Sequence, residues 1–143
     1  MYLIDTNVIS EYRKGERADA GVRRFFDEAR NGSLFVPVQV VGEVQAGIFR
    51  LRRRDDDAAG QRADMYQLWL DGLLADFKDH VLEFDVEAAR VWSALLGHEK
   101  KDPNTIDKQI AAMALVNDLT VVTRDKGEAF ARIPSLKKLN PFL

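Results

Sequence analysis

The clearest strand signal in the chain is the run Leu119-Thr120-Val121-Val122-Thr123, in which β-branched residues dominate. A second apolar run, Tyr2-Leu3-Ile4, ends at Asp5 and is typical of a buried strand. The remaining strand candidates are the runs at residues 34–36, 81–84 and 138–139. Because predicted helices separate these runs, crossover connections must join them. We therefore expect a mainly parallel sheet of about four to five strands.

Helical periodicity fills the intervals between the expected strands, with apolar residues recurring three and four positions apart. Helices of this kind cover both faces of a parallel sheet, so the sequence predicts an α/β fold. A chain of 143 residues builds one core more readily than two, and we expect a single domain over residues 1–143. The expected helices are residues 7–14, 18–30, 38–54, 60–78, 86–99, 105–117 and 126–131.

Composition narrows the class of protein. The chain has no cysteine, which excludes a disulfide framework, a thiolate nucleophile and a sulfur-ligated zinc site. Asp5 interrupts the first apolar run, and no apolar run is long enough to span a bilayer, so we expect a cytoplasmic protein with no membrane partner. The formal net charge of −2 means that any affinity for nucleic acid must come from local basic clusters or a bound cation.

Four acidic residues lie where a parallel sheet places its ligand site, in the crevice beyond the carboxyl ends of the strands. Asp5 and Asp125 follow the ends of two predicted strands. Asp107 opens the helix that leads into the run 119–123. Glu43 lies at the border of the apolar face of helix 38–54. We expect these four side chains to face one small volume.

Each of these acids also has an ordinary structural explanation. Asp5 and Asp125 precede short predicted helices, where aspartate is a common N-cap. Asp107 lies three residues after Asn104, which resembles a capping box, and a half-exposed helix residue is the ordinary alternative for Glu43. Capping does not explain Glu43, nor does it explain why three caps gather at one edge of the sheet.

Four carboxylates in one small volume repel one another, and some would be driven to protonate in the absence of a cation. A hard divalent ion, Mg²⁺ or Mn²⁺, relieves this repulsion and is the ion that a site made only of oxygen ligands prefers. Such an ion activates water and stabilises charge on a phosphoryl group. The predicted chemistry is therefore phosphodiester hydrolysis.

The same residues resemble the motifs of PIN-domain nucleases, most closely the VapC toxins and FitB-like proteins of bacterial type II toxin–antitoxin pairs. The resemblance spans nearly the whole chain, with four motifs in the family's order. The matching segments are Met1-Tyr2-Leu3-Ile4-Asp5-Thr6-Asn7-Val8-Ile9-Ser10, Val41-Gly42-Glu43-Val44 with Gly47, Asp107 with Ile110-Ala111-Ala112, Thr123-Arg124-Asp125, and Leu139-Asn140-Pro141-Phe142.

The resemblance implies a PIN-like fold and a Mg²⁺- or Mn²⁺-dependent endoribonuclease that cuts RNA. It also implies a cognate antitoxin that holds the enzyme inactive, and a homodimer. By the same resemblance, the acids of the metal site are Asp5, Glu43, Asp107 and Asp125, and the supporting residues are Asn7, Thr123 and Ser10.

A basic run follows Glu43 along helix 38–54. Arg50 projects from the same flank of the helix, and the run continues with Arg52, Arg53 and Arg54. These arginines, Arg50 and Arg53 above all, are candidates to grip an RNA backbone. A solvated helix end, favoured by the helix dipole, explains these arginines equally well. Asp102 is a lesser site candidate, and a turn residue before Pro103 is its more ordinary role. Trp69 lies on an apolar helix face and is expected in the core.

Three other functions remain as alternatives. A phosphatase with Asp5 as nucleophile needs a second aspartate two residues later as general acid, and Asn7 occupies that position. A phospho-receiver domain needs paired acids after the first strand, which the chain lacks. A PIN-like protein that acts mainly by binding, within an antitoxin–DNA complex, is disfavoured by the intact acids.

Overall fold

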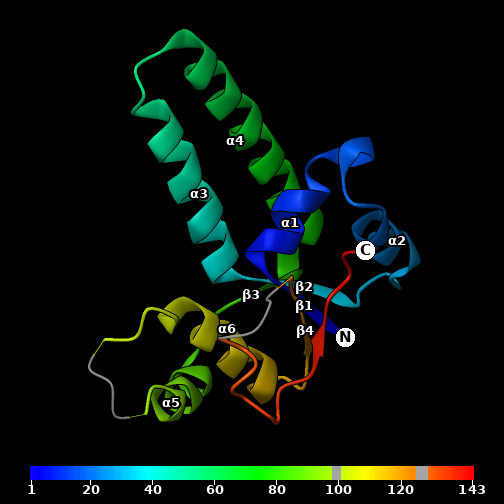
Figure 1. Ribbon diagram of the computed structural model, residues 1–143, viewed down its shortest axis with the longest axis vertical. Coiled ribbons are helices and arrows are strands. Elements are labelled where there is room, and N and C mark those ends of the chain that lie inside the picture. Colours follow the sequence, from blue (N-terminus) through cyan, green and yellow to red (C-terminus); the bar gives the residue numbers. More distant parts are fainter. Residues whose placement is uncertain (98–100, 125–128) are drawn as a thin grey trace.

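The computed structural model describes residues 1–97, 101–124 and 129–143. In these residues the chain forms an all-parallel, five-stranded sheet (Figure 1). The strands are β1 (Tyr2–Ile4), β2 (Leu34–Pro37), β3 (Val81–Leu82), β4 (Thr120–Val122) and β5 (Lys138–Leu139). Their order across the sheet is β3-β2-β1-β4-β5. The predicted α/β fold with a parallel sheet is confirmed, and β1 and β4, the two strands predicted most clearly, are neighbours near its middle.

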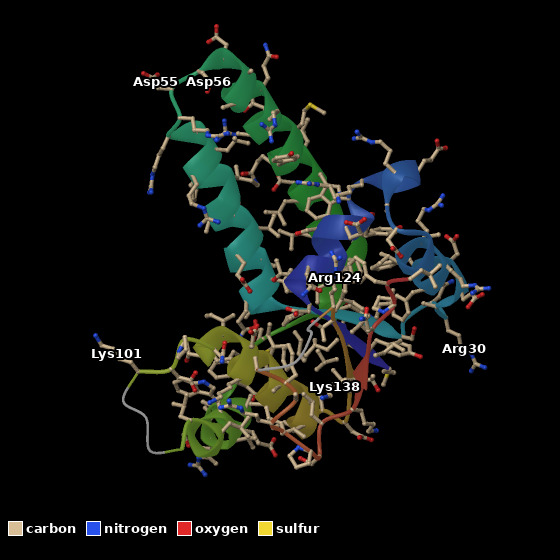
Figure 2. The ribbon with its side chains drawn as sticks, viewed as in Figure 1. Arg30, Asp55, Asp56, Lys101, Arg124 and Lys138 are labelled. Atoms are coloured by element: carbon tan, nitrogen blue, oxygen red, sulfur yellow. The ribbon has the colours of Figure 1, made fainter. Side chains whose placement is uncertain are left out.

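The helices follow the predicted order, with shifts at their ends. They are α1 (Thr6–Tyr12), α2 (Ala20–Glu28), α3 (Val38–Arg52), α4 (Asp57–Phe77), α5 (Val86–Leu95) and α6 (Thr105–Val116), with short 3-10 turns at Gly15–Arg17 and Lys78–His80. Helices α3 and α4 form a long hairpin that projects away from the sheet (Figure 1). Asp55 and Asp56 form its tip (Figure 2).

Both faces of the sheet are covered by helices, as predicted. Side chains alternate between the two faces of a strand. Leu3 of β1 therefore packs in the apolar cluster formed with α5 and α6, whereas Ile4 packs in the cluster formed with α1, α2, α3 and α4. Val121 and Val122 of β4 divide in the same way. Burial on both faces explains why these strands are continuous apolar runs in the sequence.

Local side-chain bonds and one glycine explain three of the shifted helix ends. Helix α2 begins at Ala20 because the Asp19 carboxylate accepts hydrogen bonds from the backbone N–H groups of the first turn. Helix α4 begins earlier than predicted because Asp56 caps it at the N–H of Ala59. Helix α5 ends at Leu95, and Gly97 follows with a φ of 64°, a conformation that stops a helix.

Two other segments differ from the prediction. Strand β3 is only two residues long, because Asp85 already caps α5 through the N–H of Ala88. Of the helix expected over residues 126–131, residues 129–131 form turns, and the rest lies outside the described residues. Over the described ranges, no helix combines the length and apolar character needed to cross a membrane.

Candidate active site

Asp5 stands at the carboxyl end of β1, where the sheet should place its site. Its side chain is buried, and its Oδ1 atom accepts a hydrogen bond of 2.8 Å from the backbone N–H of Thr6. Asp5 is therefore the N-cap of α1, as the structural reading of the sequence predicted. Its other oxygen, Oδ2, turns toward β4 and accepts a 2.8 Å hydrogen bond from the Thr123 hydroxyl. One carboxylate thus both caps a helix and joins two neighbouring strands.

Asn7 and Thr123 hold this carboxylate in place. The Asn7 side-chain amide donates to Asp5 Oδ2 at 3.4 Å and to Thr123 Oγ1 at 3.3 Å. Its carbonyl oxygen accepts from the backbone N–H of Arg124 at 3.0 Å. Two of the three residues predicted to support the site, Asn7 and Thr123, therefore contact Asp5 directly. A phosphatase would need a general acid at position 7, and an asparagine amide cannot supply one. The Asn7 amide instead donates a hydrogen bond to Asp5, which removes support from the phosphatase alternative.

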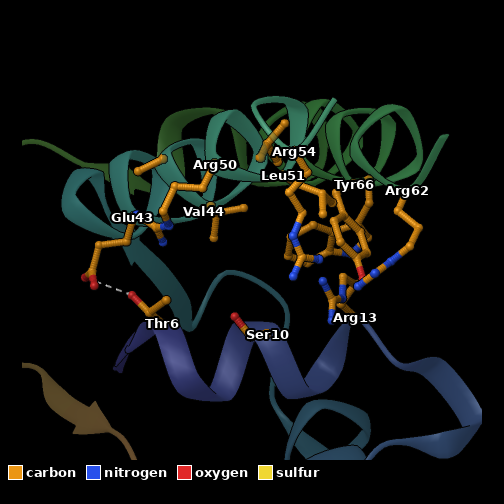
Figure 3. Close-up of a pocket in the computed structure, with 14 residues that line it drawn as sticks. Thr6, Ser10, Arg13, Glu43, Val44, Arg50, Leu51, Arg54, Arg62 and Tyr66 are labelled. Atoms are coloured by element: carbon orange, nitrogen blue, oxygen red, sulfur yellow. Dashed lines mark hydrogen bonds between the residues drawn. The ribbon is translucent and has the colours of Figure 1, made fainter. Parts of the chain in front are cut away.

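Glu43 reaches the same end of the sheet from α3. Its Oε1 atom accepts a 3.0 Å hydrogen bond from the Thr6 hydroxyl, so Thr6 bridges Glu43 and Asp5 through its side chain and its backbone N–H (Figure 3). Partial desolvation of the carboxyl group raises the pKa of Glu43, and the negative charge of Asp5 raises it further, while the Thr6 hydroxyl opposes both effects. The two carboxylates therefore repel each other electrostatically.

Asp107 lies in the first turn of α6, which is held beside α3. The Gln39 side chain, at the start of α3, donates to the side-chain oxygen of Gln109 at 3.3 Å. Asp107 is two residues before Gln109 and is half-buried. Asn104 occupies the N-cap position of α6 but makes no capping hydrogen bond with its side chain. The Asn104 side chain therefore does not make its half of the capping pair that was the structural alternative for Asp107.

Asp102 has a structural role that its sequence position suggested. Its carboxylate accepts from the backbone N–H of Asn104 at 2.8 Å and forms an ion pair with Lys108. The hydrogen bond from Lys108, with that from Asn104, lowers the pKa of Asp102. Asp102 therefore ties the loop before α6 to its first turn.

The described residues bring together part of the predicted cluster. Asp5 and Glu43 are joined through Thr6, whereas in residues 1–97, 101–124 and 129–143 no three histidine, aspartate or glutamate side chains are grouped closely enough to hold a metal ion. Asp125 lies outside the described residues, so the four-carboxylate cluster stays a prediction. The oxygen ligands and the repulsion between Asp5 and Glu43 fit a hard divalent cation.

A groove of about 670 Å³ runs from Glu43 between α1 and the α3–α4 hairpin (Figure 3). Ser10 lines it one turn along α1 from Thr6, and Arg50 lines it from α3, as predicted for the flank of Glu43. Trp69, which packs on the adjacent apolar core as expected, also contributes to its wall. Arg53 is not among the residues that line the groove.

Sequence reasoning included Arg54 but missed its neighbours at the far end of this groove, which are Arg13, Arg62 and Tyr66 (Figure 3). A signal for Arg13 was present, because Thr6, Ser10 and Arg13 are spaced i, i+4 and i+7 and so share one face of a helix.

Comparison with known proteins gives matches over nearly the whole chain. The family profile described as PIN domain matches residues 2–136. The plasmid stability protein StbB of Pseudomonas syringae pv. tomato is 34% identical over an alignment of 146 positions, which covers 99% of this chain and 99% of that protein. The VapC ribonuclease Y4jK of Sinorhizobium fredii is 33% identical over 129 residues, 87% of each protein.

A solved structure shows the same arrangement of elements. The crystal structure of FitAcB from Neisseria gonorrhoeae matches with a TM-score of 0.81 and 28% sequence identity. The match covers 99% of this chain and 98% of the chain in that structure. Similarity in sequence and similarity in fold therefore extend over the same residues.

Proposed function

Because the chain belongs to the PIN-domain family, and within it to the group of VapC and FitB-like toxins, we propose that it is a Mg²⁺- or Mn²⁺-dependent endoribonuclease. The observation that carries the proposal is the Asp5 carboxylate, held at the carboxyl end of β1 by Thr123 and Asn7 and connected through Thr6 to Glu43. The relative named as a VapC ribonuclease supports the nuclease activity. We treat residues 1–143 as one PIN domain.

Four carboxylates, those of Asp5, Glu43, Asp107 and Asp125, would hold the metal. When bound, the ion supplies Lewis-acid activation of water and neutralises charge on the phosphoryl group. The chain itself orients the ligands. Thr123 and Asn7 fix Oδ2 of Asp5, the N–H of Thr6 fixes Oδ1, and the Thr6 hydroxyl holds Glu43. Pre-oriented oxygens of this kind lose little conformational freedom when they bind an ion.

A cognate antitoxin and a second copy of the chain are the proposed partners, besides RNA as the substrate. Membership of the toxin group supports the antitoxin, because a ribonuclease active in its own cell needs an inhibitor. The groove beside Glu43 offers a surface on which a protein segment would block access to the carboxylates. Dimer formation rests on the family resemblance.

An RNA-cleavage assay with purified protein tests the proposed function. We expect cleavage of single-stranded RNA in Mn²⁺ or Mg²⁺, none in EDTA, and none with Asp5→Asn. The matched control is Asp118→Asn. Asp118 is exposed, and its ion pair with Lys137 lies at the surface, where such pairs contribute little to stability. Its φ of 52° is one that asparagine also adopts. Cleavage that persists in EDTA or in Asp5→Asn would contradict metal catalysis at this site. A wild-type protein that binds an antitoxin and DNA but cuts no RNA would favour a role in binding alone.

A further inference from the structure

The far end of the groove holds an ordered cluster of two arginines around one tyrosine. The guanidinium of Arg13, which follows α1, lies 4.2 Å from the centre of the Tyr66 ring. Arg62, one turn before Tyr66 on α4, lies 6.0 Å from the same centre. Hydrogen bonds from Arg62 and Arg13 lower the pKa of the Tyr66 hydroxyl. Two separate helices therefore place two guanidinium groups around one aromatic ring (Figure 3).

The arginines that line the groove make no close ion pairs in the described part of the chain. Four arginines line the groove, Arg13, Arg50, Arg54 and Arg62, and within residues 1–97, 101–124 and 129–143 none of them forms an ion pair with a carboxylate. By contrast, Arg52, which does not line the groove, pairs with Asp64 at 2.7 Å. Concentrated positive charge in a groove attracts an anionic ligand, even on a chain with a net charge of −2.

We infer that the Arg13–Tyr66–Arg62 cluster is a phosphate-binding site for single-stranded RNA, a few nucleotides away from the bond that is cut. This inference rests on the proposed ribonuclease function, because Thr6 and Glu43 form the opposite end of the same groove. Along the axis of α3, the eight residues from Glu43 to Leu51, which lines the groove beside the cluster, correspond to about 12 Å. A strand bound at the carboxylates and lying in the groove would therefore extend to this cluster.

The shape and chemistry of the cluster suit a nucleic-acid backbone. A guanidinium group is a planar fork that binds two phosphate oxygens at once, and stacking on a ring reduces the conformational freedom lost on binding. Arg50 lies between the two ends of the groove, so cations occur along its length and not only at one point (Figure 3). Tyr66 and Trp69 add flat aromatic surfaces of the type on which bases stack. An acidic protein segment would need the cations but not the aromatic rings beside them.

Equilibrium binding in EDTA tests the inference without catalysis. The probe is a fluorescein-labelled single-stranded RNA of about 12 nucleotides, a length within the usual range of such sites. The test variants are Arg13→Gln and Arg62→Gln. Arg90→Gln is the matched control, because Arg90 is exposed on α5, across the sheet from the groove. A polyglutamate peptide serves as the alternative anionic probe, and Arg13→Lys with Arg62→Lys retains the charge.

We expect each glutamine variant to weaken RNA binding about tenfold, the effect of losing one charge-assisted contact. Arg13→Gln combined with Arg62→Gln removes both contacts and should reduce the slope of log K against log salt concentration by about 1.4. The lysine variants should keep the slope, and Arg90→Gln should match the wild type. Equal Kd values for the wild type and both glutamine variants would overturn the inference, as would equal weakening by Arg90→Gln.

The remaining outcomes separate this inference from the proposed function. If the wild type binds RNA through the cluster but does not cut it in Mn²⁺, the ribonuclease proposal fails and the binding site stands. If the wild type cuts RNA and the glutamine variants bind it normally, the binding site fails and the ribonuclease proposal stands. If polyglutamate binds more tightly than RNA and only its binding is lost in the variants, the groove recognises an acidic protein segment and the inference is wrong.

Discussion

Replacement of Thr123 by valine is the sharpest perturbation that the structure offers. The Thr123 hydroxyl donates to Asp5 Oδ2 at 2.8 Å, and the two residues are only 3% and 5% exposed. Valine has nearly the same shape but cannot donate, so Oδ2 keeps only the longer 3.4 Å bond from Asn7 among the contacts described above. A hydrogen bond to a charged group contributes about 1.5–3 kcal/mol. We therefore expect Thr123→Val to lower the free energy of unfolding by about 2 kcal/mol in EDTA.

The same change should loosen the metal ligand and reduce Mn²⁺-dependent RNA cleavage by about 10–100-fold. Urea unfolding should show the stability loss as a fall in midpoint of about 1 M. Thr123→Ser keeps the hydroxyl and should retain most activity, and Thr120→Val makes the same substitution earlier in β4 as a control. If Thr123→Val unfolds and cuts RNA like the wild type, or if Thr123→Ser is equally damaging, the proposed support of Asp5 is wrong.

Three further predictions follow from the same structure. The pKa of Glu43 is raised above its ordinary value of 4.5, so the folded state in EDTA should lose stability as the pH rises through and just above that value. Urea unfolding measured across pH should show this loss in the wild type and not in Glu43→Gln. The same pH dependence in both proteins would contradict the raised pKa. Gly47→Ala should stabilise the fold by about 1 kcal/mol and raise the melting midpoint by a few degrees, because alanine favours a helix. An added Cβ would meet only Arg50 Nη2 at 3.7 Å, which is an ordinary contact. An equal or lower midpoint would argue against this packing. Gly21→Ala should lower the midpoint, because an added Cβ would lie 2.1 Å from the carbonyl oxygen of Pro141, and a midpoint equal to that of the wild type would show that the C-terminal segment does not pack there.

Residues placed by a strand end were predictable from the sequence. Asp5 and Thr123 follow strands β1 and β4, which the pattern of apolar residues defined well, and parallel pairing of Ile4 with Val122 brings their side chains together. Glu43 was predictable from its angle on a single helix. In each case one element and the direction of the sheet were sufficient to place the side chain.

Residues placed by the packing of several helices were not predictable in the same way. The Arg13–Tyr66–Arg62 cluster depends on how α1 lies against the α3–α4 hairpin, which no local pattern encodes. Arg50 and Arg53 were both candidates to bind RNA, yet of the two only Arg50 lines the groove. Arg53 is the C-cap of α3, beyond the last helical residue, so helical spacing alone does not fix the direction of its side chain. The C-terminal segment gives a second example, because Arg124 lies 4.7 Å from the centre of the Phe142 ring, a contact that no local sequence pattern indicates.

We propose that carboxylates from separate helices and strands bind one hard cation, and the change in melting midpoint on adding Mn²⁺ measures this binding. A ligand that binds only the folded state stabilises it by about 2.7 kcal/mol at a concentration one hundred times its Kd. We predict that saturating Mn²⁺ raises the midpoint of the wild type and of Asp118→Asn by several degrees, and that Asp5→Asn, Glu43→Gln and Asp107→Asn each lose most of that rise. A wild-type midpoint that Mn²⁺ leaves unchanged, or a full rise in Asp107→Asn, would contradict the claim.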